Sequence, residues 1–154
     1  MAKAGARVSI SGVDNLKKTL RGFDKEIDDS LERAINIAAQ TIRTQAIRLI
    51  SKGARSGVKY TRYLPYRTGI ASAQGEPPKS DTGRLVASID ATIDADKMGA
   101  TVGTNLDYGL FLEVGTSKMR ARPWLTPAFE LTRPSNIKRF QNVIATASKK
   151  AARR

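Results

Sequence analysis

The fold is decided by residues 14–51, which read DNLKKTLRGFDKEIDDSLERAINIAAQTIRTQAIRLIS. Apolar residues recur here at steps of three and four, the spacing of one face of an α-helix. The stripe consists of Leu16, Leu20, Phe23, Ile27, Leu31, Ala34, Ala38 and Ile42. Asp14 can cap the start of the helix and Gly53 can end it. The sequence therefore predicts one long amphipathic helix ending near Ser51, which Gly22 could kink or split near its start.

Segments with alternating apolar and polar residues lie on either side of this helix. Before it, Val8 and Ile10 alternate with polar neighbours. After it, the apolar members of the alternation are Ile89, Ala91, Ile93 and Ala95, and the polar members are Asp90, Thr92, Asp94 and Asp96. This pattern is typical of a strand with one face in water. Residues 97–99 form a turn in this prediction, and residues 101–104 return as the hairpin partner.

A second helix is predicted near the C-terminus. Thr126 is a capping residue, and Pro127 follows it at the first helical position. Pro134 is expected to interrupt this helix, which restarts at Pro134 or Ser135. Its apolar stripe is narrow, which is typical of a helix that lies on a partner or on a sheet. The stripe consists of Ile137, Phe140, Ile144, Ala147 and Ala151. Residues 108–114 fit a helix and a strand equally well.

Residues 52–82 contain several glycines and prolines and few apolar side chains. They predict one long central loop, which in a compact domain is usually either functional or disordered. A length of 154 residues suits a single domain, here 1–154, with a basic tail at about 148–154. The predicted fold class is α+β: a long N-terminal helix packed on a small antiparallel sheet, a C-terminal helix and the central loop.

The composition excludes several kinds of chemistry. The chain has no histidine and no cysteine, which excludes disulfides, thiolate nucleophiles, imidazole bases and His- or Cys-ligated metals. Its formal net charge of +13 indicates an affinity for something anionic: nucleic acid, a membrane surface or an acidic protein. The N-terminus lacks the apolar run of a signal peptide, and no stretch approaches the ~18 apolar residues of a membrane span. We therefore expect a soluble protein, made in a cytoplasm, without a membrane partner.

Three patterns that could carry catalysis have commoner explanations. Ser135 and Lys138 have the spacing of Ser–Lys acyl enzymes, but a helix-capping serine before a surface lysine is far more frequent. The acids of residues 90–96 could surround a divalent cation, but they lie on the wet face of a predicted strand. Residues 115–118, GTSK, lack the spacing of a phosphate-binding loop. We predict that the protein is not an enzyme and needs no cofactor or metal.

The central loop interleaves tyrosines with cations. The residues concerned are Lys52, Arg55, Lys59, Tyr60, Arg62, Tyr63, Tyr66 and Arg67. A protein that binds single-stranded nucleic acid needs positive charges to contact phosphates and aromatic rings to stack on bases. Tyrosine and arginine are, however, also the residues that dominate hot spots of protein–protein interfaces. The absence of a recognised nucleic-acid motif favours a protein interface, with room for non-specific contact with DNA.

The most specific signal lies in two segments, PPKSDTGRLVASI at residues 77–89 and DYGLFLEVGTSKMRARPWLTPA at residues 107–128. Together they resemble the gene-product-ten-like tail-component or tail-completion proteins of siphophages and prophages. The matching residues are Asp81, Thr82, Gly83, Leu85, Ser88, Ile89, Tyr108, Phe111, Glu113, Gly115, Thr116, Ser117, Lys118, Met119, Ala121, Arg122, Pro123, Trp124, Leu125, Pro127 and Ala128. Order and spacing hold over roughly residues 14–147. The tyrosine-rich loop and the basic tail depart from the family and inherit no role from it.

The resemblance implies a structural protein of the virion neck, where the tail meets the head connector. Such a protein is expected to form a homo-oligomeric ring, a hexamer, through which DNA passes with non-specific contact. Its neighbours would be a connector or head-closure protein and a tail-terminator or tail-tube protein. Two alternatives are a stand-alone basic DNA-binding protein and an assembly chaperone that is absent from the mature particle.

Elementary chemistry explains parts of the second segment. Gly115 is placed for a positive φ or a close backbone approach. Pro123 favours an extended backbone at Arg122, and the ring of Trp124 would then anchor the last helix in the core. Glu113 is expected to pair with Arg120 or Arg122, in the same subunit or the next.

Overall fold

The computed structural model describes residues 7–10, 25–96 and 98–151. In chain order the elements are β1 (Arg7–Ile10), α2 (Lys25–Ser51), β2 (Lys59–Tyr63), β3 (Tyr66–Ile70), α3 (Arg84–Ser88), β4 (Ile89–Ile93), β5 (Ala100–Thr104), α4 (Asp107–Val114) and α5 (Leu125–Ala151). The predicted α+β class is confirmed. Among the described residues, no helix combines the length and the apolar character that crossing a bilayer requires.

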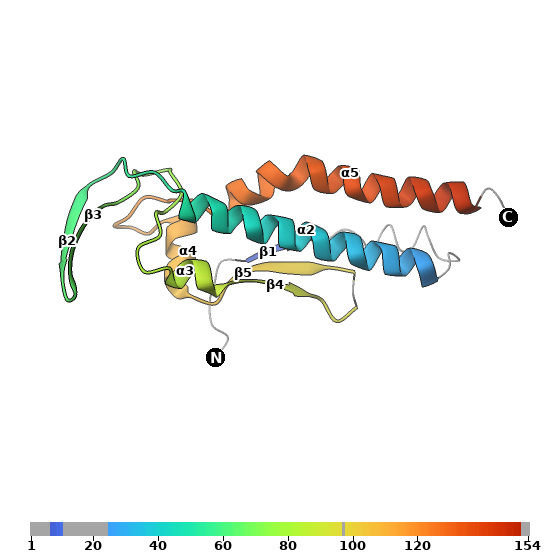
Figure 1. Ribbon diagram of the computed structural model, residues 1–154, viewed down its shortest axis with the longest axis horizontal. Coiled ribbons are helices and arrows are strands. Elements are labelled where there is room, and N and C mark those ends of the chain that lie inside the picture. Colours follow the sequence, from blue (N-terminus) through green and yellow to red (C-terminus); the bar gives the residue numbers. More distant parts are fainter. Residues whose placement is uncertain (1–6, 11–24, 97, 152–154) are drawn as a thin grey trace.

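The two long helices lie side by side over one face of a three-stranded sheet (Figure 1). The strand order is β1-β5-β4, and both pairs are antiparallel. The predicted hairpin of residues 89–104 is therefore confirmed, and the short N-terminal strand joins it along β5. The β2–β3 hairpin stands apart from this body, beyond the C-terminal end of α2 (Figure 1).

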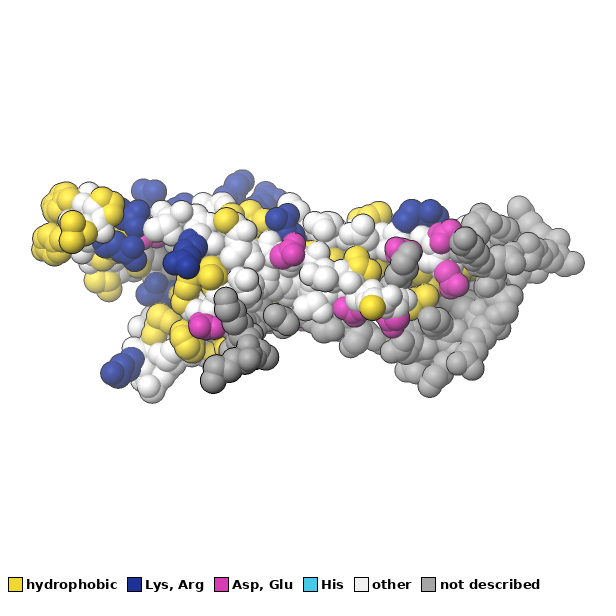
Figure 2. Space-filling model, turned by 90° about the horizontal axis from the view of Figure 1, so that it is seen from below, with side chains coloured by type: hydrophobic (Ala, Val, Ile, Leu, Met, Phe, Trp, Pro, Cys, Tyr) yellow, Lys and Arg dark blue, Asp and Glu magenta, His cyan; other side chains and the backbone are white. Residues whose placement is uncertain are grey.

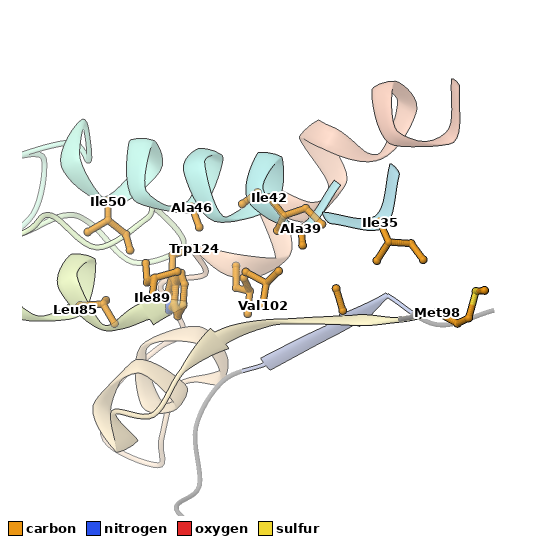
Figure 3. Close-up of a cluster of buried hydrophobic side chains, with 13 residues drawn as sticks. Ile35, Ala39, Ile42, Ala46, Ile50, Leu85, Ile89, Met98, Val102 and Trp124 are labelled. Atoms are coloured by element: carbon orange, nitrogen blue, oxygen red, sulfur yellow. The ribbon is translucent and has the colours of Figure 1, made fainter. Parts of the chain in front are cut away.

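Helix α2 is buried on two sides, because it contacts both α5 and the sheet. The predicted stripe is confirmed from Ile27 to Ile42, while its earlier members and the predicted Asp14 cap and Gly22 kink lie outside the described residues. A second row, which packs toward the sheet, is also buried: Ile35, Ala39, Ala46 and Ile50. Figure 3 shows this row of α2 above Val102 of β5, with Trp124 close by. Toward α5, Ile27 and Leu31 cluster with Ala147.

The end of α2 at Ser51 agrees with the prediction. Two of its terminal carbonyl groups accept hydrogen bonds from the Lys79–Ser80 segment: Lys79 Nζ donates to Ser51 O at 2.8 Å, and Ser80 N donates to Ile50 O at 3.1 Å. A lysine at a helix C-terminus also suits the helix dipole. About two turns earlier the helix is tied to the sheet, because Arg43 Nε donates to Ile89 O at 2.9 Å.

The prediction of one long loop over residues 52–82 was wrong in part, because β2 and β3 form an antiparallel hairpin within it. Tyr63 pairs with Tyr66, and Lys59 pairs with Ile70. No residue of either strand is buried, so the hairpin has no buried face and its sequence shows no apolar alternation. The usual periodic signal of a strand depends on one buried face.

The predicted interruption at Pro134 was also wrong, because α5 runs unbroken through this residue. A proline inside a helix leaves the carbonyl group four residues earlier without its N–H partner. Here that carbonyl belongs to Glu130, and both residues are exposed, so water can satisfy the group. Beyond Pro134 the helix continues to Ala151, and the first part of the predicted tail is its last turn.

The buried face of α5 agrees with the predicted stripe at Phe140 and Ala147 and differs from it at Ile137. Ile137 is 46% exposed, whereas Thr132 and Asn136 are buried. Both polar side chains have partners: the Thr132 hydroxyl donates to Ala128 O at 2.9 Å, and Asn136 Oδ1 accepts from Arg139 at 2.7 Å. The apolar pattern missed them because it scores a hydroxyl or an amide as an outward-facing residue.

The packing of α2 leads to a first prediction. Replacing Ile42, which is 1% exposed, by Ala should lower the free energy of unfolding by about 3 kcal/mol, because it leaves a cavity under the sheet. Replacing Ile37, which is 49% exposed on the same helix, should cost only about 0.5 kcal/mol. Denaturant unfolding of the full chain measures both changes, and equal losses would contradict this account of the core.

Candidate protein-interaction site

The two motif segments meet at one end of the sheet, where β5 leads into α4 and α3 leads into β4. Residues 107–114 form α4, which settles the helix-or-strand alternative in favour of the helix. Gly109 allows the close contact of this helix with the sheet, since a Cβ there would lie 2.5 Å from Cγ2 of Thr104 and 3.2 Å from Cδ1 of Leu85. Leu85 itself is buried in α3.

Glu113 connects α4 to the start of α5. Its Oε2 atom accepts hydrogen bonds from the backbone N–H groups of Trp124, at 2.8 Å, and Leu125, at 2.9 Å. Its Oε1 atom accepts a third from Thr126 N at 2.8 Å. The first N–H groups of a helix have no partner within the helix, and a negative charge there also interacts favourably with the helix dipole. The carboxylate of one helix therefore caps the next.

The structure contradicts the predicted Thr126 cap and the predicted pairing of Glu113 inside one chain. Thr126 is not the cap, because α5 begins one residue earlier at Leu125 and the capping group comes from α4. Glu113 does not pair with Arg120 or Arg122 within the chain, because its two oxygens accept the backbone N–H groups instead. A cap from a distant residue leaves no local sequence signal.

Trp124 anchors the junction in the core, as predicted. Its side chain is fully buried, and its Nε1 atom donates to Gly109 O at 3.1 Å. The residue therefore contacts α4 twice, through its ring nitrogen and through its own N–H on Glu113. Just before it, Arg122 N donates to Leu112 O at 2.7 Å, which holds the approaching chain along α4.

Residues 115–121 form a tight loop between α4 and α5. Gly115 has φ 81°, which confirms the predicted positive φ. A Cβ there would lie 2.8 Å from both Met119 O and Ala121 N, so the close approach is confirmed as well. Thr116 and Met119 form a small bridge, and the Thr116 hydroxyl accepts from Lys118 N at 3.2 Å and Met119 N at 3.1 Å.

Asp81 ties the first motif segment to the β2–β3 hairpin. Its carboxylate lies 2.8 Å from Nη2 of Arg67 and 3.5 Å from Nη1 of Arg62, and it accepts a hydrogen bond from the Tyr60 hydroxyl at 3.2 Å. The structure thus brings a motif residue together with three residues of the predicted basic loop. Lys52 and Arg55 are not part of this cluster; they lie on the exposed segment before the hairpin.

Two exposed apolar surfaces remain at this end of the molecule. The hairpin tip consists of Tyr63, Leu64 and Tyr66, which are 77%, 94% and 72% exposed, together with Pro65 between them. The α4 face consists of Tyr108, Phe111 and Val114, which are 39%, 47% and 65% exposed. Figure 2, which views the molecule from the sheet side, shows apolar side chains at the hairpin with cations beside them, and acidic residues toward the other half. Exposed apolar patches of this kind mark interaction sites.

A pocket of about 620 Å³ lies between the hairpin base, the segment before α3, and α4. Residues that can donate hydrogen bonds line it, among them Tyr60, Arg62, Arg84, Tyr108 and Arg122. Burial raises the pKa of Tyr108 above its usual value, and the positive charge of Arg84 opposes this shift. The lining also includes Asp81, whose carboxylate already engages Tyr60 and Arg62. The pocket could not be predicted from local sequence patterns, because its walls come from segments far apart in the chain.

The patterns considered for catalysis have structural roles. Ser135 lies inside α5, and its hydroxyl donates to Thr132 O at 2.8 Å. Asp96 Oδ1 accepts from Met98 N at 3.0 Å in the turn between β4 and β5. In the part of the chain that the structure describes, no group of three or more acidic side chains is placed to hold a metal ion.

Comparison with known proteins gives one match. The model of a family described as "Bacteriophage HK97-gp10, putative tail-component" matches residues 14–115, about two thirds of the chain. The matched range includes α2, the hairpin, α3, β4, β5 and α4, and it ends at Gly115. No curated protein and no solved structure matches the chain.

The Glu113 cap leads to a second prediction. Replacing Glu113 by Ala should lower the free energy of unfolding by about 2 kcal/mol or more, because three N–H groups lose a charged acceptor. The free energy of unfolding of Glu113→Gln should lie between those of the unchanged chain and of Glu113→Ala, because the amide keeps one acceptor oxygen. The matched control is Glu130→Ala, which removes only an exposed pair with Arg133 and should cost about 0.5 kcal/mol or less. A Glu113→Ala chain as stable as the control would show that the cap contributes little.

Gly115 leads to a third prediction. Gly115→Ala should cost more than Gly75→Ala, although both residues have a positive φ, of 81° and 83°. An alanine at Gly75 meets nothing within 4 Å and pays only the left-handed backbone cost of about 1–2 kcal/mol. Gly115 combines its positive φ with a ψ of −177°, a conformation that essentially only glycine adopts, and the close backbone atoms add a steric cost. Thermal unfolding of the two variants measures the difference, and equal melting temperatures would argue against a tight loop.

Proposed function

The chain belongs to the HK97-gp10-like family of bacteriophage tail components, and from this premise we propose that it is a structural subunit of the virion neck. In this proposal several copies form a ring, a hexamer, at the join between head and tail, and the DNA passes through the ring. Its partners are further copies of itself and the connector, head-closure, tail-terminator or tail-tube proteins on either side.

The observation that carries the proposal is the exposed hairpin and its attachment. An isolated two-stranded hairpin is marginally stable in water, so a projecting one needs support. Asp81 supplies it through Tyr60, Arg62 and Arg67. The backbone hydrogen bonds of Ala71 with Gly57 and Val58 extend the pairing of the two strands toward the body. The chain thus presents an apolar tip at a fixed place on a rigid body. This arrangement suits a protein that acts by docking.

The net charge of +13 supports a position next to an anionic partner. Both acidic neighbouring proteins and passing DNA meet this requirement. A tail component is a structural part of a virion, which agrees with a role that involves no catalysis. No particular neighbour is singled out by these observations.

A stand-alone DNA-binding role is the second candidate, favoured by the tyrosines and cations of the hairpin. The contacts of Asp81 weigh against it, because they occupy Arg67 and Tyr60 and reduce the charge available for phosphates. Such a protein should bind DNA tightly and lose affinity steeply with salt. Absence of binding at ~50 mM salt, where electrostatic contacts are strong, would remove this candidate.

The fourth prediction concerns particle assembly. Deleting the gene in the phage or prophage that encodes the chain should leave filled heads and separate tails, because the two parts are not joined. Electron microscopy of the lysate measures this, and the intact gene supplied in trans should restore joined, infectious particles. Normal infectious particles from the deletion would refute the proposed function. Detection of the chain in purified virions separates a neck subunit, which stays in the particle, from an assembly chaperone, which does not.

A further inference from the structure

We propose that the hairpin tip of one copy docks on the α4 face of a second copy, so that the contact repeats from subunit to subunit. The inference rests on the proposed function only in supposing that copies of the chain assemble with one another. It adds the two surfaces that meet. The tip is Tyr63, Leu64, Pro65 and Tyr66, and the α4 face is Tyr108, Phe111 and Val114.

The tip has the properties of an inserting element. Leu64 is 94% exposed, and the two flanking tyrosines, which are paired in the hairpin register, have ring centroids 6.2 Å apart. Tyrosine is enriched among residues that dominate interface energies. Among the described residues, no other segment packs over this tip, which stands clear of the body in both Figure 1 and Figure 2.

The α4 face has the properties of a receiving surface. Tyr108, Phe111 and Val114 recur at steps of three, so they share one side of the helix. The opposite side is held by the core, through Gly109 against Thr104 and Leu85 and through Glu113 on the start of α5. A rigid helix with an uncovered aromatic side can accept an apolar tip with little reorganisation.

The charges around the two surfaces are complementary. Arg55 and Lys59 are exposed near the base of the hairpin and have no acidic partner among the described residues. Asp107 lies at the start of α4, and Asp90 lies on the outer side of β4 at the strand end that leads toward α4. These acids also lack a cationic partner in the part of the chain described here. A polar hollow of about 350 Å³ runs along this outer side to Asn105, two residues before α4. On the other flank of the α4 face, the cation Arg84 lies beside Tyr108.

Both surfaces are present on every copy, but they are different surfaces. The hairpin base lies near α4, but in Figure 1 the tip stands away from α4 of the same chain, so one copy does not cover its own α4 face with its own tip. A contact between two different surfaces of identical subunits continues from copy to copy and closes into a ring when the rotation allows. A second copy of the chain is therefore a partner that offers an α4 face to the tip and a tip to the α4 face, each with the matching charges beside it.

Cysteine cross-linking tests this contact directly, because the chain has no cysteine of its own. Full chains carrying Leu64→Cys are mixed with tagged full chains carrying Phe111→Cys and oxidised at the highest soluble concentration. We expect a disulfide-linked heterodimer of the two chains. The double variant Leu64→Cys with Phe111→Cys should give a ladder of higher species that ends at the size of the ring.

The matched control replaces Phe111→Cys by Ile37→Cys, which lies on α2 with almost the same exposure, 49% against 47%. It should give at least fivefold less heterodimer. Equal yields from the two mixtures, or a predominance of Leu64–Leu64 dimers, would overturn the inference. The cross-link and the gene deletion test different claims. If the cross-link fails while the deletion leaves heads and tails unjoined, only the proposed contact is refuted. If the deletion gives normal particles, the proposed function is refuted whatever the cross-link shows.

Discussion

The arrangement of the candidate protein-interaction site depends on the carboxylate of Glu113, which accepts hydrogen bonds from the first N–H groups of α5. With the contacts of Trp124 and Arg122 on α4, this side chain sets the distance and direction between α4 and the long C-terminal helix. Trp124 fills the core at the same point and returns a hydrogen bond to Gly109. Because α5 packs along α2, and α2 covers the sheet, the junction relates α4 to the whole body. The exposed side of α4 is therefore presented by a rigid support.

Asp81 plays the corresponding role for the hairpin. Its carboxylate joins two arginines and a tyrosine of the central segment, and its neighbours Lys79 and Ser80 end α2. The two motif segments that resemble the phage family thus support two neighbouring surfaces, the hairpin tip and the α4 face. Several motif residues act inside the chain, among them Glu113, Gly115 and Trp124. Tyr108 and Phe111 remain exposed and available to a partner.

Much of the fold could be predicted from the sequence, where a residue pattern reports a buried face. The alternation of residues 89–95 and the apolar stripe of α2 gave their elements correctly, and the Gly115 turn followed from backbone sterics. The hairpin was missed because neither of its faces is buried. The prediction of a break at Pro134 was wrong because the carbonyl group that this proline leaves without a partner, that of Glu130, can face water. The Glu113 cap, the Asp81 cluster and the pocket join segments that are distant in sequence, so no local pattern could reveal them.

A three-dimensional reconstruction of the neck of the purified virion tests the central claim most directly. Our account predicts a closed ring of this chain between head and tail, with the DNA channel through its centre and the hairpin of each copy against α4 of the next. A neck whose density contains no copy of the chain, or copies that do not touch one another, would contradict it.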